Sequence, residues 1–455
     1  METPPAAPTV SAPRLKRSLS LWDLILYGII VIQPTAPMSV FGVLSNRGHG
    51  HVVTTILVAM VAMLFTAMSY GRMARAYPSA GSAFTYVGQE INPALGFVTG
   101  WSMVMDYMLN PMICIVWISQ QAHIFAPGVP YWAWAIFFGV VLTFLNIQGI
   151  KTSARVNTLL AAGMTAVIAV FFIAAARYLF GVPHDSGFLT RPFYDPTMWN
   201  TRAVLGGTSI AVLSYIGFDG ISTLSEEAEN PRRNILLATV LTCLVIGILS
   251  ALEVYVAQLI WPASQPFPNE DTAFTFVAGR AWAPMFAVVG FTLLVANFGS
   301  GMGAQIGAAR LLFGMGRSKA LPAFFGAVEP KRRVPFNSVI FVGAIALAGA
   351  LLVSFGIFSY GLGAEMLNFG ALIAFMGVNL AAFVRYYIRE GDKKFTNLVP
   401  PLAGFVICLL LWLNLSWPAK IAGAIWMAVG IAFGAWKTRG FRGDLVDFEL
   451  PPEES

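Results

Sequence analysis

Polar and apolar positions alternate along this chain in long blocks rather than residue by residue. Apolar runs of about 20 residues recur over nearly the whole length, and each can cross about 30 Å of hydrocarbon as an α-helix. Short polar segments separate them. The pattern predicts an all-α integral membrane protein with twelve transmembrane helices, at roughly 20–44, 51–71, 94–124, 132–150, 155–180, 203–225, 234–261, 282–312, 337–355, 362–387, 398–416 and 419–436.

Composition agrees with this pattern. The chain is 57% hydrophobic and only 11% charged, whereas a soluble domain carries about 25% charged residues. The three cysteines all fall in predicted spans, and neither a CxxC pair nor a Cys/His cluster occurs. We therefore expect no disulfide framework, no metal site and no cofactor.

A net charge of +6 is typical of some nucleic-acid-binding proteins, but the positions of the charges indicate a different cause. With the N-terminus inside, 22 of the 28 Lys and Arg residues fall in cytoplasmic segments and 6 fall outside. This is the positive-inside bias of membrane proteins, and it predicts that both termini are cytoplasmic. The basic excess then reports orientation in the lipid bilayer, and no nucleic acid is expected as a partner.

The chain reads as one membrane domain, 19–437, between two short polar tails, 1–18 and 438–455, which we expect to be disordered. No short apolar segment with a cleavage site follows the first tail, so no signal peptide is predicted. No GxxxxGK[ST] phosphate loop occurs either, which argues against a built-in ATPase. Transport, if that is the function, must use gradients or exchange.

Two of the predicted spans are interrupted. Gln33-Pro34-Thr35-Ala36-Pro37 breaks the first span, and Ser214 to Gly220 breaks the sixth with glycines on either side of an acid. Broken helices near the midplane are where secondary transporters build their binding sites. If the breaks are equivalent, the chain holds an inverted repeat, with repeat one at 19–180, repeat two at 203–387, and helices 11 and 12 (398–436) outside it.

The two breaks expose different groups. Glycines in the second free backbone N–H and C=O groups directly, whereas two prolines in the first remove donors and leave few for a carboxylate. A simple proline kink without ligand contact is the alternative for the first break. The residues predicted to bind substrate at the breaks are Gln33, Thr35, Ser39, Tyr215, Gly217, Phe218 and Asp219.

Two acids lie deep in predicted spans, Asp219 and Asp106, and no Lys or Arg lies deep in any. Intramembrane acids are costly and usually functional, so this pair suits a cationic ligand or a proton. A structural salt bridge is the alternative. Tyr107, Tyr215 and Phe218 lie beside the acids, and aromatic rings bind organic cations, although any one of them is more often a core residue.

Four further polar residues are candidates for coupling or gating. Glu226 and Glu227 follow the sixth span beside basic residues, which predicts either a cytoplasmic gate or a solvated helix end. Asn297 and Ser300 in the eighth span predict either cation coordination or polar helix packing. Asp219 and Asp106 are also candidates for the coupling role.

Specific motifs carry a family resemblance over Leu19 to Lys437. Leu19 to Asp23, Tyr77 to Tyr86, Gly217 to Asp219, Ser225 to Glu227 and Asn230-Pro231 resemble those of the amino acid–polyamine–organocation transporters. Pro78 to Tyr86, Leu224 to Glu227, and Asn368 to Leu372 are similar to the bacterial putrescine importer branch.

The resemblance implies a leucine-transporter-like five-plus-five inverted repeat with broken helices 1 and 6, working by alternating access in a bacterial inner (cytoplasmic) membrane. It also implies a substrate between those helices, coupled to protons or a counter-substrate. One departure matters: amino-acid members have a glycine-rich first break that receives the substrate carboxylate, whereas this chain has Pro34 to Ser39. An amine without a carboxylate fits that departure.

The leading hypothesis is a proton-coupled importer of a small organic cation, a putrescine-like di- or polyamine. The alternative is an amino-acid permease or an amino acid/amine exchanger. A non-transporting membrane sensor is a remote alternative, because no sizeable cytoplasmic domain follows the spans. An enzyme is not supported, since the sequence offers no nucleophile–base pair or metal cluster.

Overall fold

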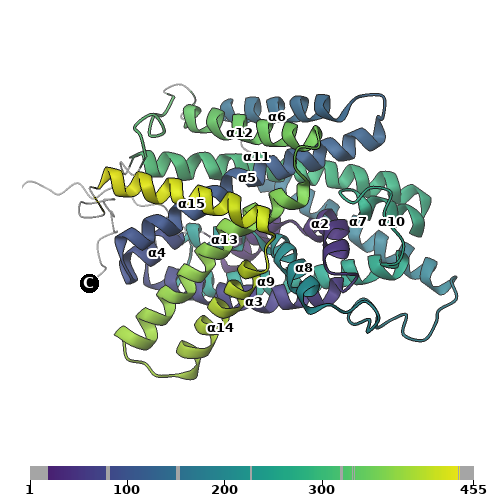
Figure 1. Cartoon of the computed structure of the whole chain (residues 1–455), viewed down its shortest axis with the longest axis horizontal. Coiled ribbons are helices and arrows are strands. Elements are labelled where there is room, and N and C mark those ends of the chain that lie inside the picture. Colours follow the sequence, from purple (N-terminus) through teal and green to yellow (C-terminus); the bar gives the residue numbers. More distant parts are fainter. Residues whose placement is uncertain are drawn as a thin grey trace, which may run out of the picture.

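The computed structural model covers the whole chain and consists of helices joined by short loops (Figure 1). It describes residues 19–77, 82–149, 154–225, 228–317, 321–329, 332, 334–438 and 440. The only β-pairing among these residues is an isolated bridge between Leu19 and Ala228. The predicted N-terminal tail, the C-terminal tail beyond residue 440, Glu226 and Glu227, and the motif positions 78–81 lie outside the described residues.

The helices follow the predicted apolar runs closely. In chain order they are α1 (Leu21–Ile32), α2 (Ala36–Arg47), α3 (Val52–Ala76), α4 (Ser82–Glu90), α5 (Pro93–Phe125), α6 (Tyr131–Ile147), α7 (Ala154–Phe180), α8 (Thr201–Ala211), η1 (Val212–Tyr215), η2 (Phe218–Leu224), α9 (Pro231–Ile260), α10 (Ala273–Ala281), α11 (Ala283–Arg317), α12 (Phe336–Ser354), α13 (Tyr360–Phe383), η3 (Val384–Arg389), α14 (Phe395–Leu413) and α15 (Trp417–Lys437).

Ten spans in the described part of the chain are long and apolar enough to cross a membrane, and eleven if the bent pair α1–α2 counts as one. The run expected at 132–150 forms α6, which is apolar but has only 17 residues. At 1.5 Å per residue such a helix covers about 25 Å. The all-α membrane architecture is thus confirmed, while the count of twelve and the inverted repeat stay predictions.

The first break bends the chain by 46° between α1 and α2. Gln33 ends α1 with a φ of 70°, a conformation that residues other than glycine rarely adopt. Pro37 occupies the first turn of α2, where its missing N–H costs nothing. The amides that remain near the break are partly used locally, because Ala36 N–H donates to the Gln33 carbonyl and Met38 N–H to the Thr35 carbonyl.

The second break is longer and has a different backbone. Helix α8 ends at Ala211, a short 3₁₀ turn η1 follows, and Ile216 and Gly217 separate it from the 3₁₀ helix η2. Gly217 has a φ of 115°, which only glycine adopts without strain. A Cβ added there would lie 2.8 Å from Cγ1 of Val31 in α1, so the glycine also allows the two breaks to approach each other.

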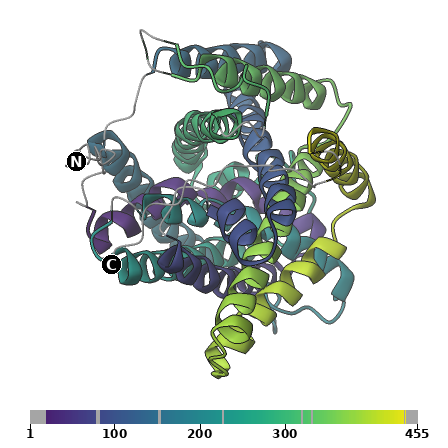
Figure 2. The ribbon, with the colours of Figure 1, turned by 90° about the vertical axis from the view of Figure 1, so that its left-hand side faces the viewer.

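Helices from both halves of the chain surround the breaks. Helix α3 packs along α9, α5 packs along α11, and α1 lies against both α9 and η2. Figure 1 shows α6 and α12 side by side at one edge with α11 and α5 beneath them, and Figure 2 shows the same pair at the top after a quarter turn. This arrangement places α5 and α11 between the edge pair and the broken helices.

Candidate functional site

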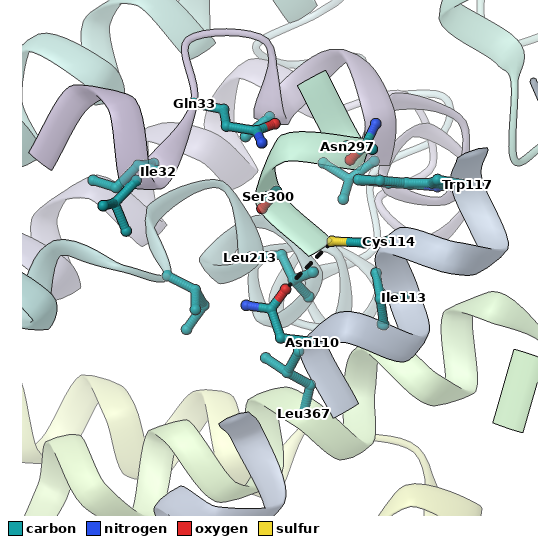
Figure 3. Close-up of a pocket in the computed structure, with 14 residues that line it drawn as sticks. Ile32, Gln33, Asn110, Ile113, Cys114, Trp117, Leu213, Asn297, Ser300 and Leu367 are labelled. Atoms are coloured by element: carbon teal, nitrogen blue, oxygen red, sulfur yellow. Dashed lines mark hydrogen bonds between the residues drawn. The ribbon is translucent and has the colours of Figure 1, made fainter. Parts of the chain in front are cut away.

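A small cavity lies between the two breaks. Its volume is about 50 Å³, enough for a few water molecules. Figure 3 shows the residues that line it. They come from α1, α2, α5, η1, α11 and α13 and from both breaks, and they are Val31, Ile32, Gln33, Ala36, Val40, Asn110, Ile113, Cys114, Trp117, Leu213, Ile216, Asn297, Ser300 and Leu367.

The polar groups of the cavity are all neutral. Gln33 Nε2 donates to the Ala296 carbonyl at 2.7 Å, which ties the first break to α11. Asn297 Nδ2 donates to Ser39 Oγ at 3.3 Å, and Ser300 lies one turn further along the same helix (Figure 3). The structure therefore brings together four of the predicted residues, three on the cavity wall and Ser39 behind it.

The two predicted acids lie close together beside this cavity, near enough for their charges to interact. Tyr107 donates its hydroxyl to Asp219 Oδ2 at 3.2 Å, and the backbone N–H groups of Gly217 and Gly220 act on the same carboxylate. One oxygen of Asp106, Oδ1, has no hydrogen-bond partner among the described residues. Both residues are 5% exposed.

No ion pair joins either acid to a Lys, Arg or His within the described ranges. An isolated buried carboxylate is strongly disfavoured, so it takes up a proton or a cation. The tyrosines around the pair are neutral: Tyr70 and Tyr107 interact with both acids, and Tyr86 interacts with Asp219. The arrangement suits a positively charged ligand or protons.

Short helical segments connect the acids to the cavity. Asn110 lines the cavity on α5 and lies one turn after Asp106, and residues four apart share a helix face. Ile216 lines the cavity three residues before Asp219. Asp106 therefore lies about one turn of α5 from the neutral cavity, and Asp219 three residues from it along the second break.

Three predicted binding residues lie elsewhere. Tyr215 is fully buried and donates its hydroxyl to the Ile56 carbonyl at 3.0 Å. Phe218 packs edge-on against Tyr70 with ring centroids 5.5 Å apart. Thr35 is buried with its hydroxyl 3.9 Å from Sδ of Met164. None of the three lines the cavity, and the first two are core residues.

Ion pairs lie near both ends of α13. Glu90 at the end of α4 is 1% exposed in its side chain and pairs with Arg385 at 2.6 Å and Arg389 at 3.0 Å. Tyr77 also donates to it, at 2.7 Å. At the other end, Glu365 pairs with Arg47. The predicted gate residues Glu226 and Glu227 lie outside the described residues.

The sequence prediction missed several residues of the site. Asn110 and Trp117 lie four and eleven residues after Asp106 on one face of α5, so helical periodicity from that acid would have found them. Tyr70 and Tyr86 come from α3 and α4, and no local signal connects them to Asp219. No group of three or more His, Cys, Asp or Glu in the described ranges has the arrangement of a metal site.

Comparison with known proteins shows which family the chain resembles. Residues 35–441 match the family described as amino acid permease. The low-affinity putrescine importer PlaP of Escherichia coli (strain K12) is 35% identical over 97% of this chain and 98% of its own. The branched-chain amino acid permease BcaP of Bacillus subtilis is 27% identical over 93% of this chain and 94% of its own. The cationic amino acid transporter 6 of Arabidopsis thaliana is 26% identical over 85% of this chain and 68% of its own.

The family match begins at Thr35 within the first break, and it covers the whole second break and every described helix after α1. Its relatives are named as importers, permeases and transporters, which confirms the resemblance found in the motifs and the prediction that the protein is not an enzyme. With two broken helices around a buried polar site, this chain belongs to the amino acid permease family of membrane transporters.

Proposed function

We propose that the protein is a secondary active importer of a small organic cation, a putrescine-like di- or polyamine, that works by alternating access. The observation that carries the proposal is the pair Asp106 and Asp219, buried together without a basic partner among the described residues. A carboxylate of this pair that has no basic partner of its own suits an ammonium group of the cargo. The importer PlaP, at 35% identity, supports the same class of cargo.

The first break supports an amine rather than an amino acid. Pro34 and Pro37 have no N–H, and the amides of Ala36 and Met38 already donate to backbone carbonyls. A substrate carboxylate therefore finds few donors at this break. An ammonium group needs acceptors instead, and the acid pair supplies them.

Coupling to protons follows from the same pair. Two adjacent buried carboxylates repel each other when both are ionised, and a proton on one of them removes that repulsion. In this scheme one acid of the pair carries a proton while the other binds an ammonium group, so that proton and cargo cross together as the site opens to each side in turn. The cavity of about 50 Å³ is smaller than the cargo requires, so its walls must move, as alternating access implies.

The proposed orientation of the protein in the membrane rests on the distribution of Lys and Arg. The excess of Lys and Arg in one set of loops supports both termini in the cytoplasm, in a bacterial inner membrane. The Glu90 network with Arg385 and Arg389 then lies on the cytoplasmic side, and the Arg47–Glu365 pair on the outer side.

A direct test is uptake of labelled putrescine into proteoliposomes with an imposed pH gradient. We expect saturable uptake that rises when the interior is more alkaline than the medium and that excess diamine competes away. Uptake that ignores the gradient overturns proton coupling. Uptake that Asp219→Asn leaves unchanged overturns the assignment of the cargo site.

One observation favours a second candidate, an amino-acid carrier. The cavity itself is lined by neutral polar groups, Gln33, Asn110, Asn297 and Ser300, and contains no carboxylate. Such a wall suits a zwitterion, and BcaP is named for branched-chain amino acids. Uptake of labelled leucine that putrescine does not compete with would favour this candidate over the amine.

A further inference from the structure

A carboxylate that the transport scheme does not use lies in the connection between α9 and α10. Asp271 is partly buried, outside the spanning helices, and Gln120 near the end of α5 donates to its Oδ2 at 3.2 Å. Its own N–H donates to Asn269 Oδ1 at 2.9 Å. No Lys or Arg in the described part of the chain forms an ion pair with it.

Aromatic side chains connect this carboxylate to the cavity between the breaks. Asp271 interacts electrostatically with Tyr131 at the start of α6 and with Tyr360 at the start of α13. The ring of Tyr360 stacks on Trp117, with centroids 5.1 Å apart, and Trp117 lines the cavity. The stacked pair Tyr360 and Trp117 therefore extends from the cavity wall shown in Figure 3 toward the charge of Asp271.

Two polar atoms on this path have no partner among the described residues. They are the Tyr360 hydroxyl and the Trp117 indole nitrogen, on residues that are 2% and 7% exposed. Buried polar groups are nearly always hydrogen-bonded, so two orphans on stacked rings, one of them interacting with Asp271, point to a ligand or water that pairs with them. The faces of Trp and Tyr rings also attract ammonium groups.

The charge at this place changes near neutral pH. Burial raises the pKa of Asp271 to about 6, and the adjacent charge of Glu270 adds to the rise. The titratable groups facing Asp271 are Glu270 on its own segment, Tyr131 from α6 and Tyr360 from α13, while Gln120 from α5 is uncharged. Above pH 6 the carboxyl is therefore mostly ionised, and at pH 5 it is mostly neutral.

We propose that Asp271, Tyr360 and Trp117 form an outer subsite that binds an alkylammonium group before it enters the cavity. The proposal rests on the proposed amine transport and on the predicted outward orientation of the α9–α10 connection. The carboxylate supplies charge, the two rings supply faces, and the orphan hydroxyl and indole N–H complete the polar contacts around the cargo.

The test measures putrescine uptake by the full chain in proteoliposomes between pH 5 and pH 7.5, at limiting and saturating substrate. For the unsubstituted protein we expect KM to rise about fivefold from pH 7.5 to pH 5, because the carboxyl loses its charge. In Asp271→Asn we expect KM at pH 7.5 to be raised about fivefold, with kcat within twofold and with little further change at pH 5. Tyr360→Phe, which keeps the ring, should raise KM about threefold.

Two controls separate binding from structure. Asp185→Asn removes an exposed loop acid that pairs with Arg191 and should change neither KM nor its pH dependence. Asp271→Glu should restore the pH dependence of KM. An Asp271→Asn variant that retains both the KM and the pH profile of the unsubstituted protein overturns the subsite, while loss of uptake in Asp219→Asn leaves the amine function standing. Absence of any putrescine uptake by the unsubstituted protein overturns both.

Discussion

The two helix breaks meet at one cavity but contribute opposite kinds of chemistry. The first, around Gln33, is made by prolines, has its nearby amides partly engaged, and presents a neutral amide to the cavity. The second, around Gly217, is made by a glycine in a left-handed conformation and carries Asp219. Under the proposed function, the first break shapes the site, whereas the second supplies the charge that binds the cation.

The largest expected effect is at the charged break. Asp219→Asn keeps the shape of the side chain but removes the charge, and we expect putrescine kcat/KM to fall by about 100-fold, corresponding to about 3 kcal/mol. Uptake kinetics in proteoliposomes measure this, with melting temperature as the check on folding. Asp185→Asn is the matched control, an acid in an exposed ion pair. Equal effects of the two substitutions would remove the charged break from the mechanism.

The backbone of the second break gives the next effect. Gly217→Ala forces a side chain into a φ of 115° and against Val31 Cγ1 at 2.8 Å. Strain of this kind costs about 1–3 kcal/mol, so we expect a lower melting temperature and about a 20-fold loss of uptake. Gly163→Ala in α7 is the control, since nothing lies within 4 Å of the added methyl group there. Identical melting of both variants would show that the turn tolerates a side chain.

A smaller effect is expected at Tyr107, which donates a hydrogen bond to Asp219. Tyr107→Phe removes the hydroxyl that donates to Asp219 at 3.2 Å and keeps the ring. Hydrogen bonds to charged groups contribute about 1.5–3 kcal/mol. Because the ammonium group of the cargo compensates for part of this lost stabilisation, we expect uptake to fall about tenfold. Tyr255→Phe, which loses a hydroxyl bonded to the Leu189 carbonyl at the surface, should behave like the unsubstituted protein.

Substitution at the first break, around Gln33, should change uptake least if the cargo is an amine. Gln33→Ala removes the donor to the Ala296 carbonyl, and we expect putrescine KM to rise only about threefold. An amino-acid substrate would depend on this wall much more strongly. A loss larger than that of Tyr107→Phe, measured in the same uptake assay, would therefore favour the amino-acid carrier.

Local chemistry in the sequence accounts for much of the fold. Helix bounds follow the apolar runs because hydropathy is a property of each segment, and both breaks lie where proline or glycine interrupts a run. Asp106 and Asp219 were recognisable as candidates because an acid in an apolar run is costly wherever the helix packs. The family motifs led to the same class of protein as the comparisons.

Other features could not be predicted because they depend on contacts between distant segments. Tyr215 and Phe218 lie beside Asp219 in the sequence, yet their helix turns direct them into the core, against the Ile56 carbonyl and Tyr70. Glu90 meets Arg385 across 295 positions of the chain. No local pattern encodes which face of a buried helix meets a cavity, since nearly every face is apolar.

The sequence by itself determined a multi-span membrane protein with two interrupted helices and acids in apolar runs, because segment hydropathy, backbone freedom and the cost of buried charge are local properties, and its motifs added the transporter family. Only the tertiary structure decided that the two acids stand together, that the cavity beside them is neutral, and that Trp117 of its wall stacks on Tyr360. Those relations arise from how α5, α11 and α13 pack around the breaks, and packing joins residues that the chain keeps far apart.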